Sequence, residues 1–468
     1  MRPAHTVEQV RAAEAELMAR LPEGALMQRA ATGLAVACAR RLGRVYAAPV
    51  VLLVGAGNNG ADALWAGAQL AGRGARVSAV LAAEPVADAL AAFRSAGGRI
   101  TGAPGPGLVV DGLVGIGGRG GLRPRAAELA AQVLGQDTVA VDLPSGVDAD
   151  TGEVAGAAVR ADLTVTFGSL KPGLLLARPW VGELRLVDIG LGPHLPAAPV
   201  EALDDAAVGR LLPRPGPLDD KYTRGVVGLA AGSQQYPGAA VLSVGAAVRA
   251  GAGMVRFAGA AHPAAQVRAR WPEAVVTEAA GAAVVDAGRV QAWVVGPGLG
   301  TDGDAERTVE AVLAQDVPVL VDADGLTVLA RHPAWLRGRT APTLLTPHDR
   351  EFARFGVELG ADRIGSARRL ATELGVHVLL KGDATVVVGP DGPARVNTTG
   401  TAALATAGSG DVLSGGTGAL LAQGLPALDA GSVGAHLHGR AGALAAGTRT
   451  TSAFDVLEHW QAAARMCG

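Results

Sequence analysis

Aspartates that directly follow short apolar runs are the residues of this sequence best suited to acid–base chemistry. Asp111 and Asp142 each end such a run, in VVDGLVGIGGRG and AVDLPSGVD. A third run, VVLLV, leads into GAGNNGAD, which carries Asn59 and Asp62. Because ligands bind at the carboxyl ends of the strands in open α/β sheets, we expect these side chains to gather at one such edge. Their oxygens can move protons or hold a hard cation.

Asp411 stands in a different setting, at the end of the small-residue loop AGSGD. The stretch that follows predicts a helix, so unobstructed backbone amides and the helix dipole would surround a phosphoryl group there. An aspartate at this point can take a proton from a hydroxyl that attacks phosphorus. The arrangement resembles that of the ribokinase-like superfamily. The simpler alternative is a glycine-rich helix start that only permits tight packing.

The glycines of the first loop leave a second interpretation open. Gly55, Gly57 and Gly60 match GxGxxG, a pattern typical of NAD-dependent oxidoreductases. Asn59 and Asp62 argue against that class, because a pyrophosphate needs only backbone amides and a carboxylate would repel it. Each strand-terminal aspartate, taken singly, is as often a helix cap as a functional group.

Alternating apolar runs and alanine-rich stretches predict the elements that position these residues. Such alternation is typical of parallel, doubly wound sheets. One series of strands is expected at 50–54, 75–81, 108–110, 138–141 and 163–167, and a second begins at 226 and continues at 293–295, 317–321, 343–345 and 376–380. The sequence therefore predicts an α/β protein with two doubly wound domains, the first Rossmann-like and the second ribokinase-like.

A proline-rich segment predicts the boundary between the two domains. At 468 residues the chain exceeds the ~250 to 300 residues at which single cores stop growing. Prolines between Pro193 and Pro217 interrupt any long regular element. We expect domains at 1–200 and 201–468, with EALDDAAVGRLL as a short helix of the second domain.

Composition excludes several classes of partner and site. A formal net charge of -2 provides no excess of basic residues that could bind nucleic acid or an anionic membrane. Cys38 and Cys467 are too few for a disulfide framework or a thiolate metal site. The first residues lack the uninterrupted apolar core of a signal peptide. We expect a cytoplasmic protein that binds neither nucleic acid nor membrane.

Four motifs in residues 1–200 resemble the NAD(P)H-hydrate epimerase family. They are GAGNNGADA, DGLVGIG, DLPSGVD and FGSLKPG, in the order of the family, although Ala61 and Ala63 replace usual glycines. The resemblance implies that two segments hold hydrated NADH or NADPH, namely Asn58, Asn59, Gly60, Ala61 and Asp62, and Gly115, Ile116, Gly117, Gly118, Arg119, Gly120 and Gly121. It also implies a potassium ion on Asn59, Asp111 and Ser145.

Asp142 falls where that family contacts its substrate. We interpret Asp142 as a catalytic acid or base, because inverting a carbinolamine-type carbon needs protons moved on and off by a positioned group. Lys171, in FGSLKPG, is expected to act with it, paired either with Asp142 or with a phosphate of the substrate. A solvated lysine is the simpler alternative for Lys171.

Residues 215–465 resemble the NAD(P)H-hydrate dehydratase family, through KYTRGVVGLAAGSQQYPGAA, VVGPGLG, VDADGL, LTPHDREF and LLKGDATVVV. The resemblance implies that the hydrated cofactor contacts Ala240, Gly298, His348 and Asp411. It implies that an adenine nucleotide is held by Lys381, Gly382, Asp383, Ala384, Thr385 and Gly410. Asp322 and Asp324 either reach Mg²⁺ through water or cap a turn. Asp349 and Arg350 depart from the family pattern, which has a glycine before the glutamate.

Together the resemblances imply repair of hydrated NAD(P)H. The first domain would interconvert the R and S hydrates, and the second would dehydrate the S hydrate with ADP or ATP and Mg²⁺, Asp411 being catalytic. The sequence is alanine-rich, as in bacterial members of the family, and these resemble ADP users, so ADP is favoured over ATP. Related dehydratases assemble as multimers, so we expect a homo-oligomer. The rival interpretation is a ribokinase-like small-molecule kinase fused to a nucleotide-binding module.

Overall fold

The protein forms two compact units in a computed structural model that describes residues 1–447 and 450–468. One unit contains Pro3–Val200, and the other contains Glu201–Gly468 together with Met1–Arg2. Both are mixed α/β structures built on largely parallel sheets, so the predicted fold class is confirmed. Among the described residues, no helix is both long and apolar enough to cross a membrane.

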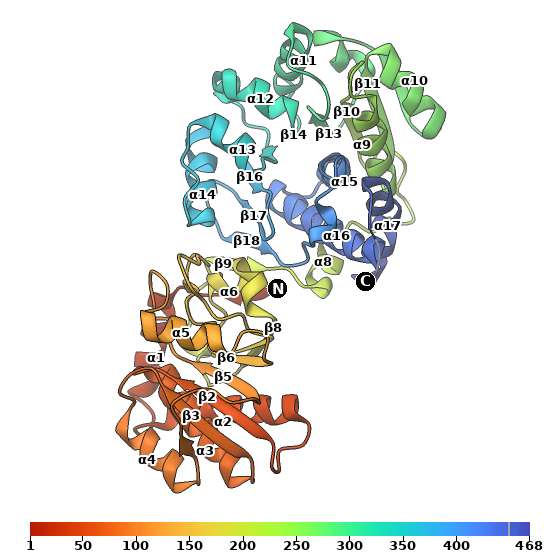
Figure 1. The fold of residues 1–468 in the computed structure, drawn as a ribbon. Helices are drawn as coiled ribbons and strands as arrows, with labels where there is room; N and C mark the ends of the chain where they lie inside the picture. Colours follow the sequence, from red (N-terminus) through yellow and green to blue (C-terminus); the bar gives the residue numbers. More distant parts are fainter. Residues whose placement is uncertain (448–449) are drawn as a thin grey trace. The chain divides into compact units, whose positions relative to one another are not determined.

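The N-terminal unit contains a fully parallel sheet in the order β4-β3-β2-β5-β6-β7-β8 (Figure 1). Its strands are β2 (Pro49–Val54), β3 (Arg76–Leu81), β4 (Arg99–Ile100), β5 (Leu108–Gly112), β6 (Thr138–Val141), β7 (Leu163–Phe167) and β8 (Glu183–Val187), while β1 (Arg2–Ala4) opens the chain. The strand order reverses between β2 and β5, which creates the crevice where open α/β sheets bind ligands.

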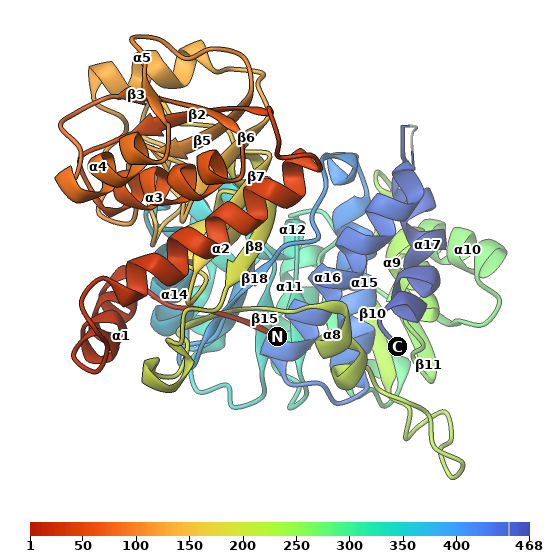
Figure 2. The same cartoon turned by 90° about the horizontal axis from the view of Figure 1, so that it is seen from below.

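Alanine-rich helices cover this sheet and supply its aliphatic core. They are α1 (Val7–Met18), α2 (Ala25–Leu42), α3 (Asn58–Gly72), α4 (Ala87–Ser95), α5 (Pro124–Gln132), α6 (Pro172–Leu176) and α7 (Arg178–Val181), followed by the 3-10 turn Gly192–His194. Helices α2 and α3 run side by side over one face (Figure 2), and α5 packs with a separate apolar cluster that includes Val51 and Val109.

The C-terminal unit contains a larger sheet in the order β1-β9-β18-β17-β16-β15-β14-β13-β10-β11-β12, in which the first strand of the chain pairs with β9. The strands from β10 to β16 are parallel, and β17 and β18 run antiparallel to their neighbours. Their bounds are β9 (Val200–Ala202), β10 (Val226–Ala230), β11 (Met254–Gly259), β12 (Val275–Glu278), β13 (Ala292–Val295), β14 (Val319–Val321), β15 (Thr343–Leu345), β16 (His377–Leu380), β17 (Thr385–Val388) and β18 (Ala394–Asn397).

Two groups of helices flank this sheet. One group includes α9 (Pro237–Arg249), α10 (Ala261–Arg270), α15 (Ser409–Ala422), α16 (Ala427–Ala446) and α17 (Ala453–Met466), which share the largest core cluster (Figure 1). The other includes α11 (Gly303–Leu313), α12 (Asp324–Arg331), α13 (Asp349–Phe352) and α14 (Arg363–Leu374). The predicted short helix after the boundary is α8 (Asp205–Leu211), and the remaining 3-10 turns are 281–287, 333–336, 353–355 and 402–404.

Candidate active sites

Four neighbouring strands of the N-terminal sheet deliver polar side chains to their carboxyl ends. Asn59 lies in the first turn of α3 after β2, Asp111 lies in β5, Asp142 follows β6, and Lys171 follows β7. These strands are adjacent in the order β2-β5-β6-β7. The parallel topology therefore gathers residues that are more than 100 positions apart in the sequence at one sheet edge, beside the reversal of strand order.

Asp111 and Ser145 form the buried centre of this edge. The Ser145 hydroxyl donates to Asp111 Oδ1 at 2.7 Å, and the Ser145 amide donates to Oδ2 at 2.9 Å. Asn59 donates through Nδ2 to the Val141 carbonyl, and a Cβ placed on Gly115 would lie 2.2 Å from Asn59 Oδ1. Burial raises the pKa of Asp111 to about 6, against the hydrogen bonds from Ser145. Asp111 and Ser145 thus form one oxygen-rich cluster, and Asn59 lies at the same sheet edge beside Gly115 and the Val141 carbonyl.

This cluster fits an alkali cation by the chemistry of its donors. Asn59, Asp111 and Ser145 offer hard oxygen ligands, with one buried carboxylate to balance one positive charge. Gly115 lacks a side chain where a Cβ would press on the Asn59 amide, so the loop can approach closely. The structure therefore brings together the three residues that the resemblance singles out for potassium.

Asp142 and Lys171 form a buried ion pair next to this cluster. Lys171 Nζ contacts Asp142 Oδ1, and the lysine side chain is only 1% exposed. Thr166 Oγ1 donates to the same oxygen at 2.9 Å, and the Phe167 amide donates to it at 3.3 Å. Since these donors all approach Oδ1, Oδ2 is the oxygen that remains for proton exchange. Of the two partners expected for Lys171, Asp142 is in contact with it in this structure.

The backbone of Asp142 is strained, which the sequence does not reveal. Its φ is 65°, a conformation that is uncommon for residues other than glycine. Ala323, between Asp322 and Asp324 in the other unit, shows a φ of 52°. Such strain costs roughly 1–3 kcal/mol and persists mainly where surrounding structure enforces it, often at functional sites. Both outliers lie directly at strand ends that carry candidate residues.

Two further carboxylates face the Asp142–Lys171 pair. Burial raises the pKa of Asp62 well above its usual value, and the charges of Asp142 and Glu14 raise it further. Asp62 Oδ1 is buried and has no hydrogen-bond partner within the described part of the chain. Glu14, in α1, has a pKa raised by burial, with Lys171 opposing that shift. Sequence reasoning missed Glu14, because nothing in its helical surroundings distinguishes it from a surface glutamate.

The remaining substrate-binding residues predicted for this unit fall into two groups. Residues 58–62 were expected in a loop, but they form the start of α3, because the turn is already completed by Gly57. Ala61 and Ala63 are fully buried in the core, so these departures from the family pattern contribute packing. The segment 115–121 stays partly exposed, and its glycines at 118, 120 and 121 line a small hollow with Arg119 and Gly146.

The C-terminal unit contains a cavity of about 440 Å³ at the carboxyl ends of β15 and β16. Most of the residues predicted to hold the nucleotide line it, together with residues that the sequence did not single out. The lining consists of His348, Lys381, Gly382, Asp383, Thr385, Asn397, Gly400, Thr401, Ala402, Leu404, Ala405, Ser409, Gly410, Leu413, Ala435 and His438. Ala384 is buried and is absent from this lining. The volume lies within the range of small-molecule and cofactor sites.

Lys381 is the charged centre between this cavity and the rest of the sheet edge. Its Nζ lies 2.8 Å from Asp322 Oδ1 and 3.5 Å from Glu351 Oε2. Burial alone would lower the pKa of Lys381, but the two carboxylates outweigh burial and raise it, so the lysine stays charged. Asp322 Oδ2 accepts a hydrogen bond from Ser414 at 2.6 Å. Both oxygens of Asp322 are therefore engaged, which favours a positioning role over a magnesium contact.

Asp411 occupies the first turn of α15, as expected. Gly408 caps this helix with a φ of 87°, a conformation that suits glycine. A Cβ on Gly410 would lie 3.8 Å from Lys381 Nζ, which places the helix start beside the lysine. Burial, together with the charges of Asp322 and Asp324 and against that of Lys381, raises the pKa of Asp411 to about 7. A carboxyl group in this range can act as a base near neutral pH.

His348, Ala240 and Gly298 surround this centre at different places. His348 caps α13 through Nδ1, which accepts from the amides of Arg350 and Glu351, and the same side chain lines the cavity. Ala240 is fully buried in α9, and Gly298 follows β13 at a point where an added Cβ would lie 2.7 Å from Ala239 Cβ. These last two lie outside the lining of the 440 Å³ cavity.

Asp349, Glu351 and Asp324 each contact another group of the protein. Asp349 pairs with Arg363 at 2.9 Å, and Glu351 accepts from the His348 amide at 2.9 Å. Asp324 accepts a hydrogen bond from the Gly300 amide at 2.9 Å. The departures from the family pattern therefore leave the buried glutamate in contact with Lys381.

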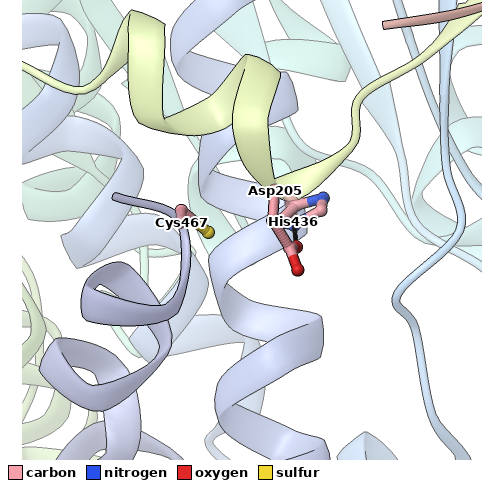
Figure 3. A group of neighbouring side chains, drawn as sticks. All are labelled: Asp205, His436 and Cys467. Atoms are coloured by element: carbon pink, nitrogen blue, oxygen red, sulfur yellow. Dashed lines mark hydrogen bonds and ion pairs between the residues drawn. The ribbon is translucent and has the colours of Figure 1, made fainter.

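A third cluster of potential ligands lies away from both sites. Ligand atoms of Asp205, His436 and Cys467 are within 4.8 Å of one another (Figure 3). Asp205 Oδ1 bonds His436 Nε2 at 2.7 Å, and Arg440 Nη2 lies 2.6 Å from Asp205 Oδ2. Burial raises the pKa of the Cys467 thiol to about 11. Because the guanidinium already neutralises the carboxylate and the thiol stays protonated, we interpret this cluster as the contact that docks α8 on α16.

Comparisons with known proteins agree with both halves of this description. Residues 227–461 match the NAD(P)H-hydrate dehydratase family, and residues 23–173 match the family of the YjeF-related protein N-terminus. A bifunctional NAD(P)H-hydrate repair enzyme from Mycobacterium tuberculosis is 52% identical over 409 residues, which are 85% of this chain and 84% of that enzyme. This chain belongs to the family of bifunctional NAD(P)H-hydrate repair enzymes.

Two further known proteins are similar to this chain. The corresponding enzyme of Mycobacterium leprae is 52% identical over 408 residues, covering 85% of this chain and 84% of that enzyme. The ADP/ATP-dependent NAD(P)H-hydrate dehydratase of Bacillus subtilis, co-crystallised with ATP and Mg²⁺, is 29% identical with a TM-score of 0.52. It aligns over 57% of this repair-enzyme chain and 98% of its own.

Proposed function

We propose that this protein returns hydrated NADH and NADPH to their intact forms. Residues 3–200 interconvert the R and S hydrates, and residues 201–468 dehydrate the S hydrate at the expense of an adenine nucleotide. The observation that carries the proposal is Asp411 at the start of α15, beside the charged Lys381 and the 440 Å³ cavity. This arrangement joins a base, a cation and a nucleotide-sized space at one sheet edge.

In the dehydration, the residues of the C-terminal unit activate a poor leaving group. Asp411 accepts the proton of the hydrate's hydroxyl while that oxygen attacks the terminal phosphorus of ADP, and the bond from phosphorus to the departing AMP breaks. The carbon–oxygen bond of the resulting ester then breaks, phosphate leaves with the bonding electrons, and the neighbouring carbon loses a proton to restore the double bond. Lys381 and the amides at the start of α15 hold the phosphates.

Asp322 and Glu351 keep that lysine in place. Asp322 binds Lys381 on one oxygen and Ser414 on the other, so the lysine is fixed relative to α15. Mg²⁺, when bound with the nucleotide, neutralises phosphate charge. Asp324 is the carboxylate of this edge that would reach the ion through water, because among the described residues it forms no ion pair and its Oδ2 accepts a hydrogen bond from the Gly300 amide. The name and ligands of the Bacillus subtilis relative support both the nucleotide and the metal.

In the epimerisation, Asp142 is the acid–base group and Lys171 its partner. Lys171 holds Asp142 Oδ1, and the free Oδ2 exchanges a proton with the hydrate. Asn59, Asp111 and Ser145 would hold K⁺, which would supply a fixed positive charge at this site. Residues 58–62 and 115–121 bind the hydrated cofactor. The strained backbone of Asp142 supports this assignment, because it aims the carboxylate from the strand end.

We further propose a homo-oligomer that works in the cytoplasm on a small-molecule substrate. The near-neutral charge and the two buried, unpaired cysteines support a reducing compartment without nucleic acid or membrane partners. Size-exclusion chromatography with light scattering tests the oligomeric state.

The experiment that tests the proposal mixes the protein with the S hydrate of NADH, Mg²⁺ and either ADP or ATP. Absorbance of the reduced nicotinamide returns, and phosphate appears together with AMP in the ADP reaction. A stable phosphate ester without recovered NADH would instead identify a small-molecule kinase. Running the two nucleotides in parallel establishes the preferred donor, which we expect to be ADP.

A further inference from the structure

Arg11, on α1, is a cation next to the N-terminal site that neither the sequence motifs nor the proposed chemistry uses. Its side chain is exposed and forms no ion pair or hydrogen bond with the residues that the structure describes. Other exposed arginines of this unit, such as Arg20 and Arg125, each pair with a nearby glutamate. The charge of Arg11 is therefore available to a ligand.

Helix α1 starts beside the segment that carries Lys171. Ala4 forms a parallel bridge with Leu170, the residue before Lys171. The helix begins three residues after Ala4 and packs its buried side into the core of the unit. Burial raises the pKa of Glu14, while the charges of Lys171 and Arg11 both lower it. α1 therefore carries Glu14 within electrostatic range of both cations.

Arg11 meets the glycine-rich segment 115–121. A Cβ placed on Gly117 would lie 3.2 Å from Arg11 Nη2, closer than side chains normally pack. Val7, one turn before Arg11 on the same side of α1, packs on the same apolar cluster as Ile116. The guanidinium thus lies beside bare backbone of a segment that we assign to the hydrated cofactor.

The backbone conformation at Gly117 does not itself require glycine. Gly120 and Gly121 have φ values of 76° and 85°, whereas Gly117 does not have a positive φ. The missing side chain of Gly117 leaves room for the guanidinium, just as that of Gly115 leaves room for the Asn59 amide. Two glycines of one segment therefore make space for polar side chains from other elements.

The phosphates of a dinucleotide need a cation at this sheet edge. Asp62, Asp111, Asp142 and Glu14 bring four carboxyl groups to it. Lys171 cannot serve the phosphates, because it is only 1% exposed and is paired with Asp142. A guanidinium that is exposed and unpaired can bind phosphate oxygens through two parallel hydrogen bonds.

We propose that Arg11 binds the pyrophosphate of the hydrated dinucleotide in the N-terminal site. The inference rests on the proposed epimerisation and adds a substrate-binding residue to it. Arg11 is only about 6 Å along the helix from its first residue, which lies near Lys171. The pyrophosphate is the phosphate group nearest to the nicotinamide ring, whereas the 2′-phosphate of NADPH is on the distant ribose. The pyrophosphate is therefore the group within reach.

The test measures epimerisation of the hydrates of NADH, NADPH and dihydronicotinamide riboside, the last of which has no phosphate. Arg11→Gln should raise the KM for the NADH and NADPH hydrates about fivefold each, as expected for an exposed charge contact. The kcat at saturating substrate should stay unchanged, because Arg11 contacts no reacting atom. The kcat/KM for the riboside hydrate should equal that of the wild type.

Two further variants separate phosphate binding from general effects of charge. Arg11→Lys keeps the charge but loses the paired donors, so its KM should lie between those of the wild type and Arg11→Gln. Arg94→Gln, at an exposed position in the last turn of α4, removes the same charge elsewhere in the unit and should leave every KM unchanged. Added salt should raise the KM of the wild type more than that of Arg11→Gln.

The inference is overturned if Arg11→Gln keeps the wild-type KM for the NADH hydrate, or if it loses as much with the riboside hydrate. An effect confined to the NADPH hydrate would also overturn it, because Arg11 would then bind the 2′-phosphate. A wild-type protein that epimerises none of the three hydrates would instead contradict the proposed function. If Arg11→Gln does not fold, Arg11→Lys and the salt dependence of the wild type decide the question.

Discussion

The aspartates that follow strands or begin helices have different roles in this protein because their neighbouring residues differ. Asp142 is locked to Lys171 and Thr166, which hold one carboxylate oxygen and leave the other available. Asp411 forms no ion pair among the described residues, and burial raises its pKa to about 7. Asp322 is committed to Lys381 and Ser414. The same residue type therefore provides a fixed acid–base group, a tuned base and a positioning group.

Asp142→Asn should abolish epimerisation while leaving dehydration of the S hydrate intact. The amide cannot exchange the proton, and loss of a general acid or base costs about 10²–10⁴ in rate. Interconversion of the two hydrates, followed by chromatography, measures the effect. Asp188→Asn, at the exposed end of β8 in the same sheet, is the matched control and should epimerise normally. Unchanged epimerisation by Asp142→Asn would remove Asp142 from the mechanism.

Dehydration should depend on pH through Asp411. Its pKa is raised to about 7, so the base is unprotonated above that value and protonated below it. The kcat/KM for the S hydrate should therefore rise with pH through about 7, not through about 4 as for an ordinary aspartate. Rates measured between about pH 5.5 and 8.5 give the profile, and a flat profile would contradict the assignment.

Asp411→Asn is the control for this profile. It should lose about 10²–10⁴ in rate at every pH. A carboxyl whose pKa is raised in the folded state stabilises the protein below its unfolded-state pKa, and that contribution is lost as pH rises through about 7. The melting temperature of Asp411→Asn at pH 8 should therefore be no lower than that of the wild type, which shows that lost activity is not lost folding.

At the residue scale, the sequence indicated which residues belong to the sites better than it indicated their conformations and contacts. Asp111, Asp142 and Asp411 were identified because they end apolar runs or small-residue loops, and those patterns are local. The φ of Asp142, the contact between Lys171 and Asp142, and the partial burial of Glu14 depend on contacts between distant segments.

The elements that carry the sites were predictable where the strands are buried. Central strands such as β2, β5 and β10 are continuous apolar runs, and the structure places them where the sequence predicts. Strands β4, β8, β11 and β12 were missed. Edge strands with mixed polar residues such as ELRLV lack that signal, and in the interior strand β11 Arg256 interrupts the apolar run. β17 and β18 form an antiparallel pair at the far end of the sheet, outside the repeating pattern.

The glycines of α15 have two different roles, one in packing and one at the site. Gly415 approaches α9 so closely that a Cβ would lie 2.0 Å from the Ser243 carbonyl. Gly410 faces the site, where a Cβ would meet nothing nearer than 3.8 Å. The first glycine is therefore needed for packing, whereas the second leaves its amide open to a ligand.

Gly415→Ala and Gly410→Ala should separate these two roles. Gly415→Ala forces α9 and α15 apart and should destabilise the C-terminal unit by roughly 1–3 kcal/mol or more. Gly410→Ala should fold normally and bind ADP more weakly. Chemical denaturation and calorimetry measure the two effects. Equal stability loss in both variants would show that the whole turn is structural.

The contact between α8 and α16 is a second element-scale feature. Asp205 binds both His436 and Arg440, so it ties the segment after the domain boundary to the core of the C-terminal unit. Arg440→Met should destabilise folding by about 1–2 kcal/mol, because it leaves a partly buried carboxylate without its cation. Urea denaturation measures the change, with Arg465→Met near the end of α17 as the control. A stability equal to the wild type's would make this ion pair dispensable.

At the scale of the whole molecule, each unit has its own sheet, its own reversal of strand order and its own site. The two doubly wound sheets were predictable from the repeated strand–helix pattern. Since the dehydratase acts on one epimer and the epimerase supplies it, the fusion provides both steps of one repair reaction. Neither step requires direct transfer between the units, because a free epimer can diffuse.

The measurement that tests this account most directly starts from the pure R hydrate of NADH. With the intact protein, ADP, Mg²⁺ and K⁺, reduced-nicotinamide absorbance should recover completely and faster than the spontaneous epimerisation seen without protein. Asp142→Asn should recover it no faster than that spontaneous rate, although it still consumes the S hydrate. An intact protein that restores NADH from the S hydrate while the R hydrate disappears only at the spontaneous rate would contradict the assignment of two linked activities.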